Sequence, residues 1–228
     1  MRLAGIQKLT LLDYPGKLAC TLFAPGCNLR CPFCHNASLV LGPAGALEPD
    51  EVLAFLRKRR GVLQGVCLTG GEPLLQPDAA DFLLRVRELG YAVKLDTNGA
   101  LPDRLRAAVE AGAVDCVAMD VKNAPDAYGE TVGLPDFDLS PIRESVAYLL
   151  SGPVDFEFRT TVVRELHDEA RLLALARWIA GAPRYFLQPF TDSGDVLRPG
   201  LSGYGEAELR ALLAAVRTVL PAAQLRGV

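Results

Sequence analysis

The chain has 228 residues, half of them hydrophobic, a formal net charge of −3 and an isoelectric point near 5.5. This length and composition can bury one sizeable core, and the slightly acidic balance provides no basic field that would attract nucleic acid. No apolar stretch reaches the roughly 18 residues of a membrane span, and the first residues lack the apolar segment of a signal peptide. We therefore expect a cytoplasmic protein that binds neither membrane nor nucleic acid.

Strand-like and helix-like segments alternate from residue 17 to the end of the chain. The sequence predicts short buried strands at residues 17–24, 65–68, 91–95, 114–119, 154–163 and 185–188. It predicts helices at residues 49–60, 78–89, 102–111, 139–150, 169–180 and 206–220. Six strand–helix repeats with short connections indicate an α/β fold with a parallel sheet and helices outside it.

The six repeats fall short of the eight that close a (β/α)8 barrel. We expect a partial (β/α)6 barrel with parallel strands, open on one side. A doubly wound open sheet is the alternative topology. No internal repeat, low-complexity tract or linker marks a boundary, so residues 1–228 are expected to form a single domain.

Three cysteines, Cys27, Cys31 and Cys34, lie within eight residues with the spacing C-x3-C-x2-C. A cubane iron–sulfur cluster normally uses one thiolate for each of its four irons, so three thiolates without an obvious fourth leave one iron open to small molecules. A zinc site that adds His35 is an alternative, although zinc ligands of that kind usually come as two separated pairs. Disulfides are not expected where thiols stay reduced.

Polar or glycine-rich motifs follow the expected strands. They are Thr69-Gly70-Gly71-Glu72-Pro73, Asp96-Thr97-Asn98-Gly99, Asp120-Val121-Lys122-Asn123, Arg159-Thr160-Thr161 and Gln188-Pro189-Phe190. Each alone has a simpler explanation, such as a tight glycine turn, a cap, or an ion pair between Arg159 and Glu157. In a parallel barrel, however, all strand ends share the face where active sites are built. Their joint arrival there, beside the cysteine loop, indicates a functional site.

With these motifs the chain resembles the radical S-adenosylmethionine (SAM) superfamily. The cysteine loop of that family carries an aromatic residue before its last cysteine, here Phe33, and the family's GGEP motif stands at residues 70–73. Four segments are similar to the branch that activates glycyl-radical enzymes, above all to activators of anaerobic ribonucleoside-triphosphate reductase: LLDYPG (11–16), PGCNLRCPFCHN (25–36), DTNG (96–99) and MDVK (119–122). The resemblance runs from about residue 5 to residue 190.

The resemblance implies a [4Fe–4S] cluster held by Cys27, Cys31 and Cys34, with SAM chelated at the open iron. It implies reductive cleavage of SAM to methionine and a 5′-deoxyadenosyl radical, which takes a hydrogen atom from a backbone glycine of a partner enzyme. The expected partners are a glycyl radical enzyme, in first place anaerobic ribonucleotide reductase, and an electron donor such as flavodoxin or ferredoxin. The cofactors carry the chemistry, and the protein supplies orientation and exclusion of water.

Within the resemblance, the GGEP motif and the aromatic residue have expected contacts with SAM. Phe33 is expected beside the adenine. Gly70 and Gly71 are expected where the backbone approaches the ligand, and Glu72, followed by Pro73, is expected to bind the methionine amino group.

The later strand ends have further implied roles. Asp96, Thr97 and Asp120 resemble positions that shape a monovalent-cation site near the SAM carboxylate. Two close carboxylates would repel that group unless a cation intervened. A second set is expected to contact SAM or the incoming glycine loop: Asn98, Lys122 and Arg159.

Three other positions are less defined by the resemblance. Gln188 stands where the family often has a histidine, so the contact made there is open. His35 is expected behind the cluster ligands, and His167 is expected on the surface. Cys20, Cys67 and Cys116 are expected in the core, where free cysteine is common.

The connection between residues 36 and 49 is too short for an inserted ferredoxin-like domain, so a single cluster is expected. Two alternatives to an activating enzyme stay open at this point. One is a radical SAM enzyme acting on a small molecule or a peptide, and the other is a zinc or electron-transfer protein without enzymatic activity.

Overall fold

A single eight-stranded sheet organises the computed structural model, which describes residues 1–42 and 47–228. The strands are β1 (Gly5–Thr10), β2 (Ala19–Ala24), β3 (Gly65–Gly70), β4 (Ala92–Thr97), β5 (Cys116–Asp120), β6 (Asp155–Val162), β7 (Tyr185–Pro189) and β8 (Ala223–Leu225). β1 pairs antiparallel to β2, and every later pair of neighbours is parallel. The six predicted strands correspond to β2 through β7.

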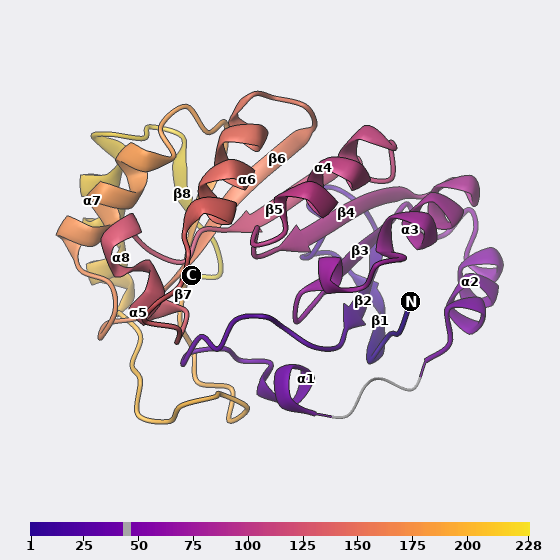
Figure 1. Cartoon of the computed structure of the whole chain (residues 1–228), viewed down its shortest axis with the longest axis horizontal. Coiled ribbons are helices and arrows are strands. Elements are labelled where there is room, and N and C mark those ends of the chain that lie inside the picture. The colour runs from indigo at the N-terminus through magenta and orange to yellow at the C-terminus, as the bar shows by residue number, and fades with distance from the viewer. Residues whose placement is uncertain (43–46) are drawn as a thin grey trace.

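The spatial order of the strands distinguishes the two expected topologies. A doubly wound sheet reverses its strand order at a switch point, whereas here the order in space is the order in the chain, from β1 to β8. The sheet therefore curls in one direction, as a barrel does (Figure 1). Within the described residues, β1 and β8 are the two edge strands and do not pair with each other, so the expected partial α/β barrel, open on one side, is confirmed.

Six helices connect the parallel strands, and all six were expected. They are α2 (Pro49–Lys58), α3 (Ala79–Glu88), α4 (Pro102–Glu110), α6 (Ser140–Leu150), α7 (Glu169–Trp178) and α8 (Glu206–Arg217), and they lie on the outside of the sheet (Figure 1). Their boundaries follow ordinary helix chemistry. In α2, for example, Pro49 occupies the first position, acidic residues fill the first turn, and Arg57 and Lys58 lie in the last.

The structure contains elements that the sequence did not predict. β1 has one buried residue, Thr10, and β8 has three residues, so neither carries a run of buried apolar residues. Four short helical segments are also present: α1 (Ala37–Leu41), η1 (Pro73–Leu75), η2 (Pro125–Ala127) and α5 (Tyr128–Thr131). α1 lies within the predicted connection 36–49, of which residues 43–46 are outside the described part of the chain.

Tyr14 lies at the end of the barrel opposite the strand carboxyl ends, in the loop between β1 and β2. Its buried ring packs against Ala19 and Cys116. A Cβ atom on Gly65 would stand 2.9 Å from the ring, so this glycine makes room for it. Through Tyr14, the LLDYPG segment therefore packs against the amino-terminal ends of the barrel strands. Cys20, Cys67 and Cys116 are all buried and free, as predicted.

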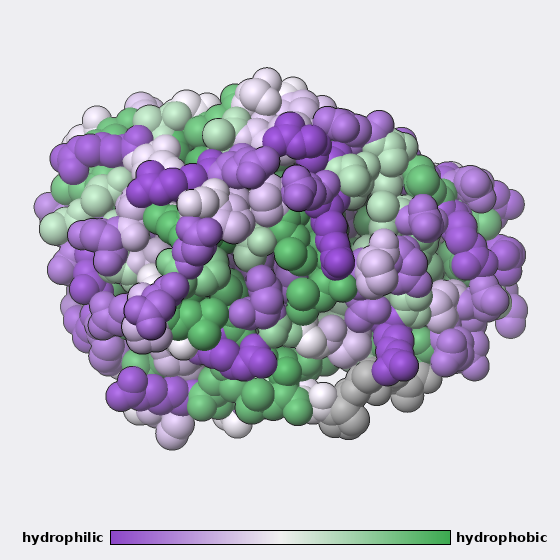
Figure 2. Space-filling view, viewed as in Figure 1, coloured by the Kyte–Doolittle hydropathy of each residue, from purple (hydrophilic) through white to green (hydrophobic). Residues whose placement is uncertain are grey.

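The surface of the molecule is mixed in character. Figure 2 shows polar side chains over both ends of this face and hydrophobic side chains along its lower edge, near α1, where Leu41 is exposed. None of the helices in residues 1–42 and 47–228 has the length and hydrophobicity of a membrane-spanning segment.

Candidate active site

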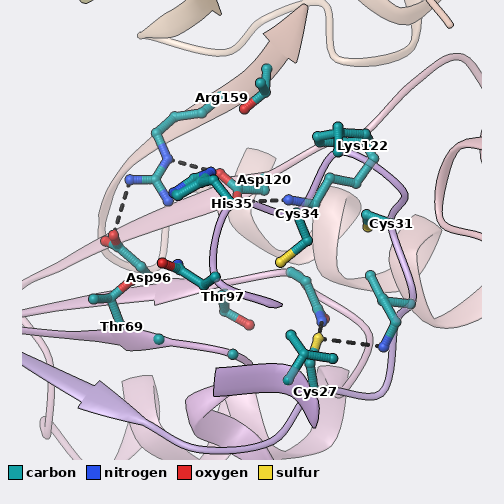
Figure 3. A pocket seen from close by; sticks show the side chains of 18 residues that line it. Cys27, Cys31, Cys34, His35, Thr69, Asp96, Thr97, Asp120, Lys122 and Arg159 are labelled. Carbon is teal, nitrogen blue, oxygen red and sulfur yellow. Dashed lines mark hydrogen bonds and ion pairs between the residues drawn. The ribbon is translucent and has the colours of Figure 1, made fainter. Parts of the chain in front are cut away.

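An ion network joins the carboxyl ends of β4, β5 and β6. The guanidinium of Arg159 lies between two carboxylates, with its Nη1 3.0 Å from Asp96 Oδ2 and its Nε 2.9 Å from Asp120 Oδ1 (Figure 3). Lys122 Nζ extends the network at 2.9 Å from Asp120 Oδ2. The sheet register creates this arrangement, because Asp120 and Arg159 are direct partners across β5 and β6. Arg159 therefore does not pair with Glu157, the simpler explanation considered from the sequence.

The network keeps its acidic groups ionised although they are largely out of water. Burial alone would raise the pKa of Asp120, but Arg159 and Lys122 reverse this and hold that pKa well below its usual range. For Asp96, burial again opposes ionisation, and Arg159 with Lys94 lowers the pKa. These carboxylates are therefore charged at neutral pH.

Lys94 forms the inner end of the network, and sequence reasoning missed it. Its ammonium contacts Asp96 Oδ1 and its side chain is only 1% exposed. Lys94 precedes Asp96 by two positions in β4, so both side chains point into the barrel. That alternation was the signal that could have revealed Lys94.

The network carries an excess of positive charge. Three cationic side chains, Lys94, Arg159 and Lys122, face the two carboxylates of Asp96 and Asp120. The repulsion from which a bridging monovalent cation was inferred is therefore already relieved by side chains. A monovalent cation at Asp96, Thr97 and Asp120 stays a prediction that this geometry does not require.

The cysteine loop lies across the carboxyl ends of the strands and is held by segments distant in the sequence. The backbone N–H of Arg30 donates to Val132 O at 2.9 Å, and that of Arg198 donates to Pro32 O at 2.9 Å. On α1, Ser38 Oγ donates to Asp195 Oδ2 at 2.7 Å. The loop after β5 and the loop between β7 and α8 thus hold the cysteine segment from two sides.

The cysteine loop and the ion network border one cavity. It offers about 700 Å³ of space not filled by protein atoms, part of it open to solvent. Its lining includes most of the expected ligand-binding residues: Cys27, Cys31, Phe33, Cys34, Gly70, Gly71, Asp96, Thr97, Asn98, Asp120, Lys122 and Arg159. Thr69, His35 and Thr161 also line it and were not among the expected contacts.

The three cysteines of the loop are free thiols. Figure 3 shows the sulfurs of Cys27 and Cys34 directed into the cavity. Burial raises the pKa of Cys31 to about 12, so this thiol needs a metal to displace its proton. In residues 1–42 and 47–228, no three Cys, His, Asp or Glu side chains stand close enough to share one metal ion.

Gly70 and Gly71 bring the end of β3 against the start of the cysteine loop. Gly70 has φ of +123°, a backbone conformation that favours glycine. A Cβ atom on Gly71 would stand 1.9 Å from the carbonyl oxygen of Gly26. Gly71 therefore allows two backbone segments to touch. Both glycines also line the cavity, and their close approach to a ligand stays a prediction.

The side chain of Glu72 does not line the cavity, in contrast to its expected contact with an amino group. It is fully buried, and its carboxylate accepts hydrogen bonds from Leu74 N at 3.0 Å, Thr97 Oγ1 at 2.9 Å and Asn98 N at 2.7 Å. Pro73 is buried beside it and starts η1. Glu72 therefore positions the loop after β4.

The expectation that His167 lies on the surface is wrong, because the residue is buried and only 1% exposed. Its Nδ1 accepts a hydrogen bond from Val163 N at 3.1 Å, and its Nε2 lies 2.8 Å from Lys122 O, to which it donates. The imidazole thus fixes the position of the Lys122 backbone by a hydrogen bond. His167 and Lys122 are 45 residues apart in the chain, so no local sequence pattern indicates this contact.

Gln188 lies in a second cavity that adjoins the first. This space, about 660 Å³ including its solvent-open part, is lined by the end of β7 and the residues that follow it. His35 and Thr161 border both cavities. The structure therefore places Gln188 outside the first cavity, in the one that adjoins it.

The chain has clear similarity to known proteins. The family model of the Radical SAM superfamily matches residues 21–176. The chain belongs to the radical SAM superfamily. A Methanocaldococcus jannaschii protein named "Putative glycyl-radical enzyme activating enzyme MJ1227" is 32% identical over 195 residues, covering 82% of this chain and 79% of that protein. The 7-carboxy-7-deazaguanine synthase of Methanopyrus kandleri is 32% identical over 213 residues, covering 82% of this chain and 80% of the synthase.

Solved structures support the fold. Streptococcus suis SuiB bound to the precursor peptide SuiA superimposes with a TM-score of 0.73 at 17% identity, covering 90% of this chain and 48% of SuiB. At that identity the likeness concerns the partial radical SAM barrel alone.

The residues present fit the cofactors of a radical SAM enzyme, a [4Fe–4S] cluster and SAM. Three free thiols border one cavity, as a cluster with an open iron needs. The ion network that borders the same cavity carries an excess of positive charge, which suits the carboxylate of SAM. Between them, the glycines at the end of β3 leave backbone exposed to a ligand.

Replacing Gly71 with Ala should reduce the iron content of the protein, because the new Cβ must displace the backbone of Gly26 next to Cys27. Overpacking of this kind costs about 1–3 kcal/mol. Iron and sulfide analysis after anaerobic reconstitution checks the prediction. Gly5→Ala is the control, since its Cβ would meet nothing closer than Phe23 Cδ2 at 3.9 Å. Equal iron in both variants would contradict the close-approach explanation.

Replacing Lys94 with Met should lower the free energy of unfolding by about 3 kcal/mol, because it leaves a buried carboxylate with one cationic partner fewer. Urea unfolding measures this loss. Arg85→Met is the matched control: the pair between Arg85 and Asp50 is exposed, and its loss should cost less than about 1 kcal/mol. If both variants lost the same stability, the buried end of the network would contribute no more than a surface ion pair.

The stability contributed by Glu72 should fall as pH rises. Burial raises the pKa of Glu72 from 4.5 to about 7, although hydrogen bonds from Asn98, Leu74 and Thr97 limit the rise. A raised folded-state pKa means that the contribution is complete below pH 4.5 and is lost as pH rises through 7, a loss of about 3 kcal/mol. Urea unfolding between pH 4.5 and 8 should show this decline in the wild type and not in Glu72→Gln. Parallel pH profiles for the two proteins would overturn the assignment.

Proposed function

We propose that this protein is a radical SAM activase that installs a glycyl radical on a partner enzyme, and that the partner is anaerobic ribonucleotide reductase. One observation carries the proposal. The cavity that fits the cofactors adjoins a second cavity at the end of β7, which is open to solvent and shares His35 and Thr161 with the first. A backbone segment of another protein has room to lie there. The similarity to the M. jannaschii protein named as an activating enzyme supports this choice.

The residues of this chain have distinct tasks in the proposed reaction. Cys27, Cys31 and Cys34 would hold a single cluster, and Phe33, Gly70 and Gly71 would border SAM. When bound, these cofactors supply the one-electron cleavage of SAM to methionine and a 5′-deoxyadenosyl radical that takes a hydrogen atom from a glycine.

The ion network would orient the reacting groups. Arg159 and Lys122 would attract the SAM carboxylate, while Asp96 and Asp120 hold both cations in place. Gln188 would face the incoming glycine loop from the second cavity. A monovalent cation beside Asp96, Thr97 and Asp120 belongs to the proposal as an optional further ligand.

The proposal also covers the setting of the protein. It would act in an anaerobic cytoplasm as a single radical SAM domain of residues 1–228, with flavodoxin or ferredoxin as the electron donor. These choices follow from the resemblance of the cysteine loop and the strand-end motifs to activating enzymes.

A second function is supported by one comparison. The M. kandleri relative is named as a synthase of a deazaguanine, a small molecule, and the chain covers 80% of it. Under this alternative the second cavity would receive a small molecule, or a peptide, instead of a protein loop.

The reconstituted protein, reduced with dithionite in the presence of SAM and anaerobic ribonucleotide reductase, should produce the doublet electron paramagnetic resonance (EPR) signal of a glycyl radical. Cys31→Ala should lose both the signal and the cleavage of SAM, since the cluster would lack a ligand. SAM cleavage without any protein radical on the reductase or another glycyl radical enzyme would refute the activase function. It would leave the small-molecule alternative.

A further inference from the structure

The three cysteine sulfurs of the loop differ in their hydrogen bonds. Cys27 Sγ accepts from the backbone N–H of Leu29 at 3.4 Å and from the side-chain amide of Asn98, with Nδ2 at 3.7 Å. Figure 3 marks both contacts as dashed lines to the sulfur of Cys27. In residues 1–42 and 47–228, the sulfurs of Cys31 and Cys34 accept no such hydrogen bond. Leu29 is only two residues from Cys27, whereas Asn98 belongs to a different part of the chain.

The amide of Asn98 has a defined orientation. Its Oδ1 accepts from the backbone N–H of Ala100 at 2.9 Å, and its Nδ2 donates to Asn28 Oδ1 at 2.9 Å. Because an amide has one oxygen acceptor and two N–H donors, these two partners leave the second N–H free for Cys27. Rotating the amide by half a turn would set oxygen against oxygen and nitrogen against nitrogen.

The backbone beneath Asn98 is equally restrained. Its own N–H donates to Glu72 Oε2 at 2.7 Å, and the preceding Thr97 donates to Glu72 Oε1 at 2.9 Å. Glu72 is fully buried and Asn98 is 6% exposed. The donor that faces Cys27 is therefore oriented before any ligand arrives.

We propose that Asn98 is a positioning residue that raises the reduction potential of the cluster by donating a hydrogen bond to the Cys27 thiolate. Reduction adds one electron from a low-potential donor, and no bond or proton is exchanged. The added negative charge is shared by the thiolate ligands, and an N–H donor stabilises it more in the reduced state than in the oxidised state. This role differs from the contact with SAM or a glycine loop that the sequence implied for Asn98.

Redox titration of the reconstituted protein, followed by EPR with dithionite as reductant, tests the proposal. Asn98→Ala should retain its iron and shift the reduction equilibrium toward the oxidised cluster by about tenfold, which is 59 mV for one electron. Asn98→Asp should shift it further, because a carboxylate cannot donate and adds a negative charge. Asn28→Ala is the matched control, since it removes the other partner of the amide while Ala100 still orients it; its shift should stay below threefold.

Two results would overturn the proposal: an unchanged potential in an iron-replete Asn98→Ala protein, or an equal shift in Asn28→Ala. A purely structural role for Asn98 would change iron content without moving the potential of the cluster that remains. The two measurements therefore distinguish an effect of Asn98 on the reduction potential from an effect on the structure of the cysteine loop.

A measurement on the wild-type fold covers the case in which Asn98→Ala fails to hold a cluster. In protein labelled with ¹⁵N-asparagine, pulsed EPR of the reduced cluster should detect a coupling to ¹⁵N that persists in Asn28→Ala. Its absence from the wild type would exclude the hydrogen bond. Neither experiment uses SAM or a partner enzyme, so the outcome is independent of the proposed activase function.

Discussion

The guanidinium of Arg159, placed between the carboxylates of Asp96 and Asp120, is the interaction on which the rest of the site depends. Three strands end within reach of it, and each contributes one of the three groups. Taking such charges out of water is costly unless every one finds a partner, so the register of β4, β5 and β6 at this end is narrowly defined. The part of the cavity wall that β4, β5 and β6 supply has its shape because these charges must meet.

The arrangement of elements could be predicted because it depends on local patterns. Buried strand runs and amphipathic helices are readable in the sequence, and parallel strands bring their ends to one face, so the position of Asp96 or Asp120 followed directly. The edge strands β1 and β8 could not be predicted in the same way. One has a single buried residue and the other has three residues in all, and both exist because a neighbouring strand offers an edge.

Individual contacts in the site were harder to predict because they depend on tertiary packing. Glu157 looked like a partner for Arg159, yet it forms a two-pronged pair with Arg226, 69 residues later, at 2.6 and 2.8 Å. His167 and Lys122 meet across 45 residues. The GGEP motif was read as ligand chemistry, whereas Gly71 and Glu72 also hold the protein's own backbone together. A sequence motif identifies residues that belong to a site, but their contacts are defined only by the tertiary structure.

The hydrogen bonds that hold the cysteine loop have a thermodynamic consequence. Arg198 and Asp195, which follow the seventh strand, bind the same short segment that carries Cys31 and Cys34. If iron binds this segment more tightly when the loop between β7 and α8 is attached, iron must stabilise that attachment, and release of the loop must weaken iron binding by the same free energy. Retention of the cluster and attachment of this loop are then coupled in one equilibrium.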